Sequence, residues 1–168
     1  RLGVDGGASV LFYLATYAFA NLTIFAGISV VGSRVGGDNI SDYKALIRKS
    51  PQMAIMMSFA LIALIGIPPT GIFVSKFYIF SAAMENELTW LVIVGVINSV
   101  ISAYYYVRLI KVMFETDNTD SDDNKMDAPG LTLAAMYITT AGTIWLGVSP
   151  SWYIAILEQG ISLLSGVN

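Results

Sequence analysis

Lys76 is the only charged residue between Met53 and Met84, a segment of 32 residues that is otherwise apolar or uncharged. Just before it the chain reads Gly66-Ile67-Pro68-Pro69-Thr70-Gly71. An unbroken α-helix accommodates this run poorly, because proline lacks an N–H and its ring clashes with the preceding turn. A basic side chain beside a helix break in an apolar segment indicates, in membrane proteins, a site of ion or proton movement.

The composition is that of a membrane protein. The chain has 168 residues, of which 55% are hydrophobic and 12% charged, against roughly 25% charged in soluble domains. It contains no Cys and no His, so disulfides, thiolate or imidazole metal ligands and a histidine proton carrier are excluded. A proton carrier must therefore be Lys, Asp, Glu, Tyr or water. We find no phosphate loop, dinucleotide fingerprint or catalytic triad, and we expect no metal and no nucleic-acid partner.

The apolar segments predict an all-α, polytopic transmembrane helix bundle. The second of its four segments is too long for one straight crossing, since 32 residues of helix reach about 48 Å and the hydrocarbon core is about 30 Å thick. A break at Gly66 to Gly71 divides it into half-helices of about 14 residues each. The predicted spans are 8–31, 53–84, 88–107 and 131–148.

Two short helices joined by a surface turn are the alternative for the second segment. The flanking pieces are short for full spans, and the turn carries no charge. Backbone groups freed by a break are tolerated at membrane depth only inside protein or beside a water-filled cavity. We therefore favour a single discontinuous span.

Lys and Arg concentrate in two connections, while the turn between the second and third spans has only Glu85 and Glu87. Because basic loops favour the cytoplasm, we expect both connections there, and Arg1 and Asn168 on the opposite side. The chain starts without Met and is interpreted as the C-terminal piece of a longer polypeptide. The basic residues of the two connections are Arg34, Lys44, Arg48 and Lys49 in the first, and Arg108, Lys111 and Lys125 in the second.

Two polar or amphipathic segments have simpler interpretations. The acidic segment Asn118 to Asp127 lacks the ordered ligand spacing of a metal loop, so we expect a solvated connection. The tail Pro150 to Leu164 carries Trp152 and Tyr153 among aliphatic residues. It is expected to lie along the outer interface of the membrane.

Lys76 has an alternative role as an interfacial anchor or structural ion pair. It lies nine residues before Glu85, about 13 Å along a helix, whereas a lysine stem reaches about 6 Å, so snorkelling is strained. Burial disfavours the charged form of an ammonium, which allows such a lysine to gain and lose a proton. We therefore favour proton transfer.

The third span offers a polar face. Asn98, Ser102 and Tyr105 follow each other at spacings of four and three residues, so they share one side of a helix and are candidates to line a hydrated path. The alternative is interhelical hydrogen bonding together with an aromatic belt at Tyr104–Tyr106. For the polar residues of the first span, Thr16, Asn21 and Thr23, we expect roles in helix packing.

The stretch Ala63 to Phe80 resembles the broken helix of the antiporter-like subunits of respiratory complex I (NADH:quinone oxidoreductase), in particular subunit N. Asp42-Tyr43-Lys44-Ala45-Leu46 with Pro51, and the run from Asn98 to Arg108, are similar to that subunit's connection and penultimate span. The sequence departs from the usual Pro-Thr-Ala-Gly-Phe-Val-Gly-Lys pattern, since Gly71-Ile72 replaces Ala-Gly and Ser75 replaces the glycine before the lysine.

The resemblance implies that this chain is the last four of fourteen spans and that Lys76 belongs to a proton path from a central hydrophilic axis to the outer face. The family's other channel residues lie in earlier spans, so this piece cannot form a complete channel alone. The implied partners are other membrane-arm subunits, the N-terminal part of the same subunit and the lipid bilayer. No redox cofactor is expected in this chain; quinone, FMN and iron–sulfur clusters are expected in partner subunits.

The resemblance also implies a bacterial or archaeal plasma membrane, or an organellar inner membrane. Two alternatives to a complex I subunit stay open. One is a subunit of a multisubunit sodium/proton antiporter or of a membrane-bound hydrogenase arm, which shares the broken helix. The other is a purely structural scaffold in which Lys76 is ion-paired to a carboxylate.

Overall fold

A computed structural model describes residues 6–37, 39–116 and 125–165, and contains only helices and connections in these ranges. The all-α prediction is therefore confirmed. The long helices are α1 (Gly6–Val35), α3 (Pro51–Ile65), α4 (Gly71–Glu85), α5 (Thr89–Phe114), α6 (Gly130–Val148) and α7 (Pro150–Ser165), and the short ones are the 3-10 helix η1 (Ile40–Tyr43) and α2 (Leu46–Lys49).

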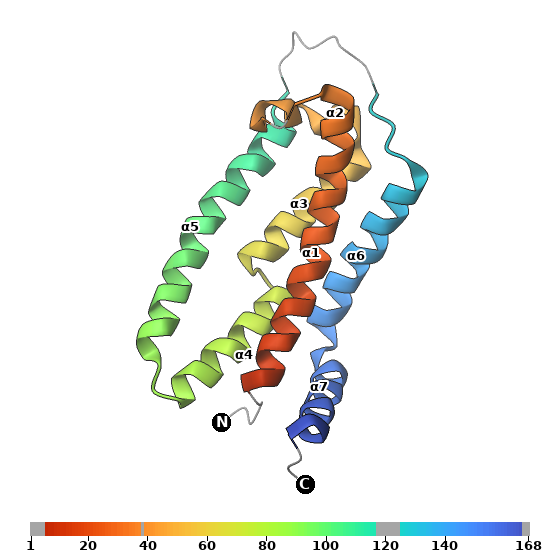
Figure 1. Cartoon of the computed structure of the whole chain (residues 1–168). Coiled ribbons are helices and arrows are strands. Elements are labelled where there is room, and N and C mark those ends of the chain that lie inside the picture. The colour runs from red at the N-terminus through yellow and green to blue at the C-terminus, as the bar shows by residue number, and fades with distance from the viewer. Residues whose placement is uncertain (1–5, 38, 117–124, 166–168) are drawn as a thin grey trace.

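The helices form an elongated bundle (Figure 1). Helix α1 runs its full length, α3 and α4 return one after the other, α5 runs beside them, and α6 returns on the other side of α1. Three helices, α1, α5 and α6, are long and apolar enough to cross a membrane, and α3 is a shorter apolar helix. Helices α1 and α5 extend beyond the predicted spans, and their last turns contain Arg34 and Lys111. Cations are favourable in the last turn of a helix.

The core lies mainly between α1, α3 and α6. Met53, Met57 and Ala60 of α3 are buried, and Gly27 of α1 lies directly against the Met57 side chain. Small residues at such contacts let membrane helices approach closely. Close packing matters here because the hydrophobic effect contributes little to helix association within lipid. Tight packing of α1 on α3 therefore fixes the position of the first half of the second segment.

Polar side chains join helices within this apolar bundle. Thr23 and Thr139 share a hydrogen bond of 2.6 Å between α1 and α6, and the Thr16 hydroxyl donates to the Ser75 hydroxyl at 3.3 Å between α1 and α4. The predicted packing roles of Thr16 and Thr23 are confirmed. Asn21 instead donates back to the Tyr17 carbonyl one turn earlier.

The two basic connections lie at one end of the bundle, as predicted, because η1, α2, the end of α5 and the start of α6 meet there (Figure 1). Which side of a membrane this end faces stays a prediction. Arg1, Asn168 and residues 118–124 of the acidic segment lie outside the described residues.

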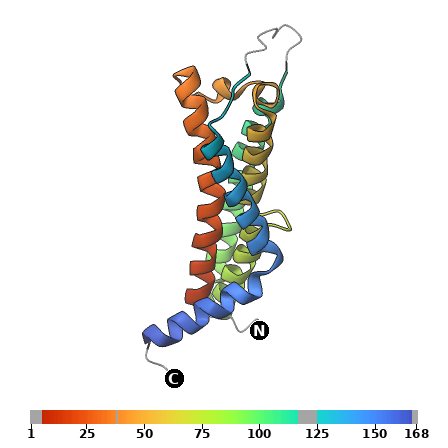
Figure 2. The same ribbon diagram turned by 90° about the vertical axis from the view of Figure 1, so that its right-hand side faces the viewer.

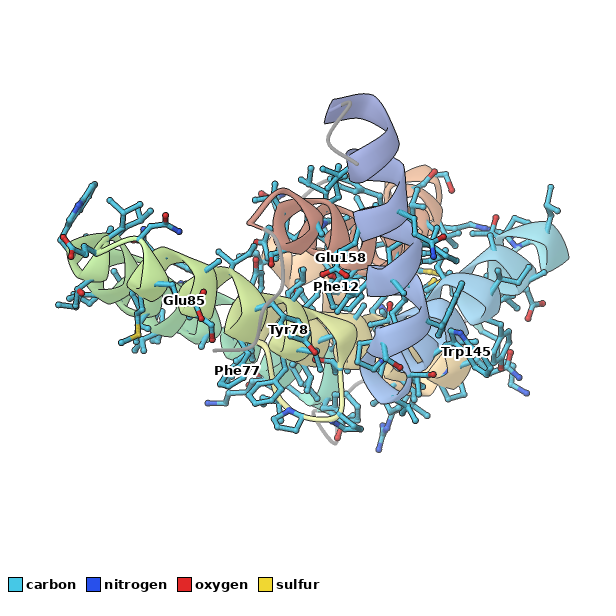
Figure 3. The ribbon with its side chains drawn as sticks, turned by 90° about the horizontal axis from the view of Figure 1, so that it is seen from below. Phe12, Phe77, Tyr78, Glu85, Trp145 and Glu158 are labelled. Atoms are coloured by element: carbon cyan, nitrogen blue, oxygen red, sulfur yellow. The ribbon has the colours of Figure 1, made fainter. Side chains whose placement is uncertain are left out.

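Helix α7 crosses the opposite end of the bundle at a steep angle to α6 (Figure 2). Seen from that end, α7 lies over Phe12 of α1, with Tyr78 of α4 beside it (Figure 3). The Phe12 ring is fully buried and has its centroid 5.9 Å from that of Tyr153 and 6.4 Å from that of Tyr78. The predicted interfacial tail is thus a helix anchored to the bundle by aromatic contacts.

Candidate functional site

The segment between α3 and α4 separates these two helices halfway along the bundle (Figure 2). Gly66 ends α3 with φ 90° and ψ 52°, and its N–H donates to the Ala63 carbonyl at 2.9 Å. This left-handed conformation is the common way to end a helix and is unstrained only for glycine. The glycine before the proline pair therefore sets where α3 stops.

The turn between α3 and α4 runs from the interior to the surface of the bundle at Ile67 and returns to the interior at Thr70. Ile67 is 45% exposed, whereas Thr70 is 2% exposed, and the peptide bond between Pro68 and Pro69 is cis. Thr70 is the N-cap of α4: its hydroxyl accepts from the Phe73 N–H at 3.4 Å and donates to the Ile67 carbonyl at 2.8 Å. Such a cap satisfies a backbone donor at the start of a helix, so α4 restarts at a defined residue.

Two glycines let the interruption pack against α1 and α6. A Cβ added to Gly71 would lie 2.8 Å from Cγ2 of Thr16, and one added to Gly147 would meet the Pro69 carbonyl oxygen and lie 2.6 Å from the Thr70 carbonyl carbon. Both contacts are closer than any side chain allows. Gly71 was part of the predicted break, but no sequence pattern indicated Gly147, because its role depends on how α6 crosses α3 and α4.

Lys76 of α4 reaches back across the interruption. Its Nζ donates to the Leu64 carbonyl at 3.2 Å, to the Ile65 carbonyl at 3.1 Å and to the Ser99 hydroxyl at 3.3 Å. The last carbonyls of a helix have no partner within it, and the end of the helix dipole there is negative. An ammonium has three donors, so the three acceptors match the protonated lysine.

Ser99 on α5 completes this set of acceptors. Its hydroxyl donates to the Gly95 carbonyl at 2.9 Å, so the single hydroxyl hydrogen is engaged and the oxygen can accept from Lys76. Ser99 lies within the predicted third span, 88–107, but is not one of the predicted site residues. The one signal that could have found it is a hydroxyl in an apolar span, next to Asn98.

Lys76 also lines a cavity of about 380 Å³ between α1, α4 and α5. Asn98 and Ser102 line it as well, whereas Tyr105 is not among its lining residues and is 60% exposed beside Tyr104. Each residue turns a helix by about 100°, and the side of α5 that faces Lys76 is centred nearer Ser99 than Asn98, which rotates Tyr105 away. The tyrosines that do line the cavity are Tyr13, Tyr17 and Tyr106.

A second cavity, of about 400 Å³, lies on the other side of the lysine and is mostly apolar. Phe73, Phe77 and Val100 line it together with Lys76 and Ser99. The ammonium thus lies between a cavity with tyrosine, amide and hydroxyl groups and one formed largely by hydrocarbon. Tyrosine and amide side chains lie on only one of these two sides of Lys76.

Ser75, which replaces the glycine found before the lysine in the usual pattern, packs against α1. The Ser75 side chain is fully buried; its hydroxyl donates to the Ile72 carbonyl at 2.9 Å and accepts from Thr16 at 3.3 Å. A buried hydroxyl without partners would be destabilising; Ser75 has one partner in its own helix and a second in Thr16 of α1. In the described parts of the chain, no group of three His, Cys, Asp or Glu side chains could hold a metal ion.

The helices define the class, a polytopic integral membrane protein of the all-α type. The family model for NADH:quinone oxidoreductase/Mrp antiporter, TM matches residues 2–102, and the chain belongs to this family. The resemblance inferred from the broken-helix motif is thereby confirmed.

Named relatives agree with this family. The chain is 41% identical over 161 residues to NADH-quinone oxidoreductase subunit N 1 of Solibacter usitatus, covering 95% of this chain and 33% of that protein. It is 39% identical over 156 residues to NADH-quinone oxidoreductase subunit N 2 of Herpetosiphon aurantiacus, covering 92% of this chain and 28% of that protein. The chain thus spans about a third of the length of the curated relatives it matches.

A solved structure has the same fold. A chain of respiratory complex I from Thermus thermophilus with bound aureothin matches with a TM-score of 0.74 at 23% identity, over 90% of this chain and 34% of that chain. At this identity the match shows the helical arrangement alone.

Proposed function

We propose that this chain is the C-terminal part of a proton-translocating, antiporter-like subunit in the membrane arm of a complex I-type NADH:quinone oxidoreductase. The names of the relatives and their greater length support this proposal. The chain would contribute to an enzyme whose redox chemistry takes place in other subunits, and it would couple electron transfer to quinone to proton pumping across a plasma membrane.

Within this proposal, α3 and α4 form one discontinuous span. Each helix has 15 residues and is about 22 Å long, too short to cross a hydrocarbon core of about 30 Å alone. Together with α1, α5 and α6 they make four spans over residues 1–168. The end with the basic connections would face the cytoplasm, with Arg1 and Asn168 on the other side.

The observation that carries the proposal is the contact of Lys76 Nζ with the Leu64 and Ile65 carbonyls at the break. These acceptors stabilise the charged lysine through hydrogen bonds and the helix dipole. A neutral amine has only two N–H donors, so loss of a proton releases one acceptor. The polar cavity of about 380 Å³ has room for several water molecules at about 30 Å³ each, and these would receive the proton.

The surface of the chain supports a larger assembly. The most apolar window of α5 has no buried residue, and the Ile67 turn is exposed. Because freed backbone is tolerated at membrane depth only where protein or water covers it, the N-terminal part of the same subunit would cover the turn. Other membrane-arm subunits and lipid would cover the rest, and quinone, FMN and iron–sulfur clusters would belong to partner subunits.

The test is to replace Lys76 with Met in the assembled complex. We expect NADH-driven proton pumping into membrane vesicles to be largely lost, because Met keeps the volume of the side chain and removes its exchangeable proton. Lys111→Met is the matched control, since Lys111 lies on α5 away from the break and its loss should leave pumping unchanged. An assembled Lys76→Met complex that pumps normally would overturn the assignment.

A subunit of a sodium/proton antiporter is the second candidate, because the family description also includes Mrp antiporters. The genes next to this one distinguish the two, since iron–sulfur and quinone-site subunits accompany a complex I and small antiporter subunits accompany an antiporter. A structural scaffold would require Lys76 to be paired with a carboxylate. The described partners of its Nζ are instead two carbonyls and a hydroxyl.

A further inference from the structure

A second concentration of basic side chains surrounds a cavity at the end of the bundle, far from Lys76. The cavity has a volume of about 360 Å³ and lies between α2, the start of α3 and the residues that lead into α6. Arg48 and Lys49 line it from α2, and Lys125 lines it from the opposite wall. Asp127 also lines it, so three positive charges and one negative charge leave a net charge of +2.

Hydrogen bonds hold the walls of this cavity together. The Met126 N–H donates to the Lys49 carbonyl at 2.9 Å, and Nη2 of Arg34 on α1 donates to the Asp127 carbonyl at 3.0 Å. Met126 is 9% exposed. The segment that carries Lys125 is therefore fixed against α1 and α2, and the cavity is a built feature of the fold.

The start of α3 adds donors to the same place. Ser50, the N-cap residue, is 8% exposed and lines the cavity, but its side chain makes no cap hydrogen bond. The first N–H groups of a helix lack partners within it and favour an anion. A serine whose side chain makes no cap bond, a helix start and three cations thus line one space, which suits a phosphate group.

We propose that this cavity binds the phosphate of an anionic phospholipid. Apart from Gln52, its remaining lining is apolar, from Pro51, Met126, Ala128 and Leu133, and Leu131 nearby is 86% exposed. The apolar helices α3 and α6 both begin here, so the cavity lies where polar connections meet membrane-spanning segments. A headgroup bound in it has its acyl chains alongside α3 and α6, which a free phosphate ion would not use. Basic pockets between membrane helices bind anionic headgroups in this way.

The test uses the purified membrane complex that contains this chain. Photoreactive phosphatidylglycerol is the probe and photoreactive phosphatidylcholine its zwitterionic control, with labelled peptides mapped by mass spectrometry. We expect phosphatidylglycerol to label residues 48–52 and 126–133. The double variant Arg48→Gln/Lys125→Gln should reduce this labelling on the order of twenty-fold, at roughly five-fold for each basic side chain near a membrane surface.

The matched control is Arg108→Gln/Lys111→Gln, which removes two positive charges at the same end of the bundle but outside the cavity. It should label as the unchanged complex does. If the double variant does not assemble, Lys125→Gln alone, at an exposed side chain, should still reduce labelling about five-fold. Equal labelling by phosphatidylcholine, equal loss in the control or no label at these peptides would overturn the proposal. Full protection by inorganic phosphate would assign the site to a free anion and overturn the lipid.

Discussion

The two halves of the second segment, α3 and α4, have the same length but different surroundings. Nine of the 15 residues of α3 are buried within this chain, whereas only Gly71, Ile72 and Ser75 are buried in α4. Helix α3 is thus largely enclosed by helices of this chain, whereas α4, which carries Lys76, leaves Phe73, Phe77 and Met84 exposed. The half with the ionisable group is therefore the half with more surface left for other parts of an assembly.

Gly147→Leu should have the largest effect, because it separates the break from α6. Its side chain would occupy the space of the Pro69 carbonyl and the Thr70 backbone, and overpacking of this kind costs typically 1–3 kcal/mol, or more where backbone cannot move. We expect the complex to lose this subunit, measured by native gel electrophoresis of solubilised membranes. Gly160→Leu on α7 is the control, since a Cβ at Gly160 meets nothing within 4 Å. Normal assembly of Gly147→Leu would show that the contact is not required.

Matched alanine substitutions in the two halves test the comparison directly. Met57 of α3 is fully buried and Phe77 of α4 is 56% exposed. Met57→Ala leaves a cavity and should destabilise by about 2 kcal/mol or more, while Phe77→Ala should change stability by about 0.5 kcal/mol or less in the isolated subunit. The measurement is the thermal shift of the detergent-purified subunit. A larger effect of Phe77→Ala in the assembled complex than in the subunit would show that α4 is packed by its partners.

Ser99→Ala should have the smallest effect on assembly, and its effect should fall on proton pumping. It removes one of three acceptors of Lys76 and leaves the two carbonyls in place, a loss of about 1.5–3 kcal/mol for a hydrogen bond to a charged group if nothing replaces it. We expect a changed pH dependence of pumping with unchanged assembly, measured in vesicles at a series of pH values. Ser99→Thr should restore the original profile, and Ser102→Ala should leave it intact. An unchanged profile in Ser99→Ala would mean that the carbonyls alone hold the lysine.

The sequence is sufficient to predict that the helix stops at Gly66 to Gly71 and that Lys76 lies beside this break. Gly66 and the proline pair have local effects on the backbone, and these do not depend on the rest of the fold. Pieces of about 14 residues were expected on either side of Gly66 to Gly71, and α3 and α4 each have 15, while their union into one span stays a proposal. Basic connections at a common end follow from the number of spans between them.

Other features depend on how helices are rotated and how closely they cross. Ser99, Gly147 and Tyr106 face the site because of the orientation of α5 and α6, and helices that are apolar on all sides carry little periodic signal for that orientation. The same limit explains Tyr105: the spacing correctly groups it with Asn98 on one side of α5, but does not indicate which side faces Lys76. A polar residue in an apolar span indicates that its side chain makes a contact within the protein, but the sequence does not indicate which residue it contacts.

The contact of Lys76 with the end of α3 has a consequence for movement. The side chain belongs to α4, yet two of its hydrogen bonds are made to carbonyls 11 and 12 residues earlier, so the lysine connects the start of α4 to the end of α3. An amine that has lost a proton has two donors for these three acceptors, so a change in the charge of Lys76 is expected to weaken the attachment of α4 to the end of α3.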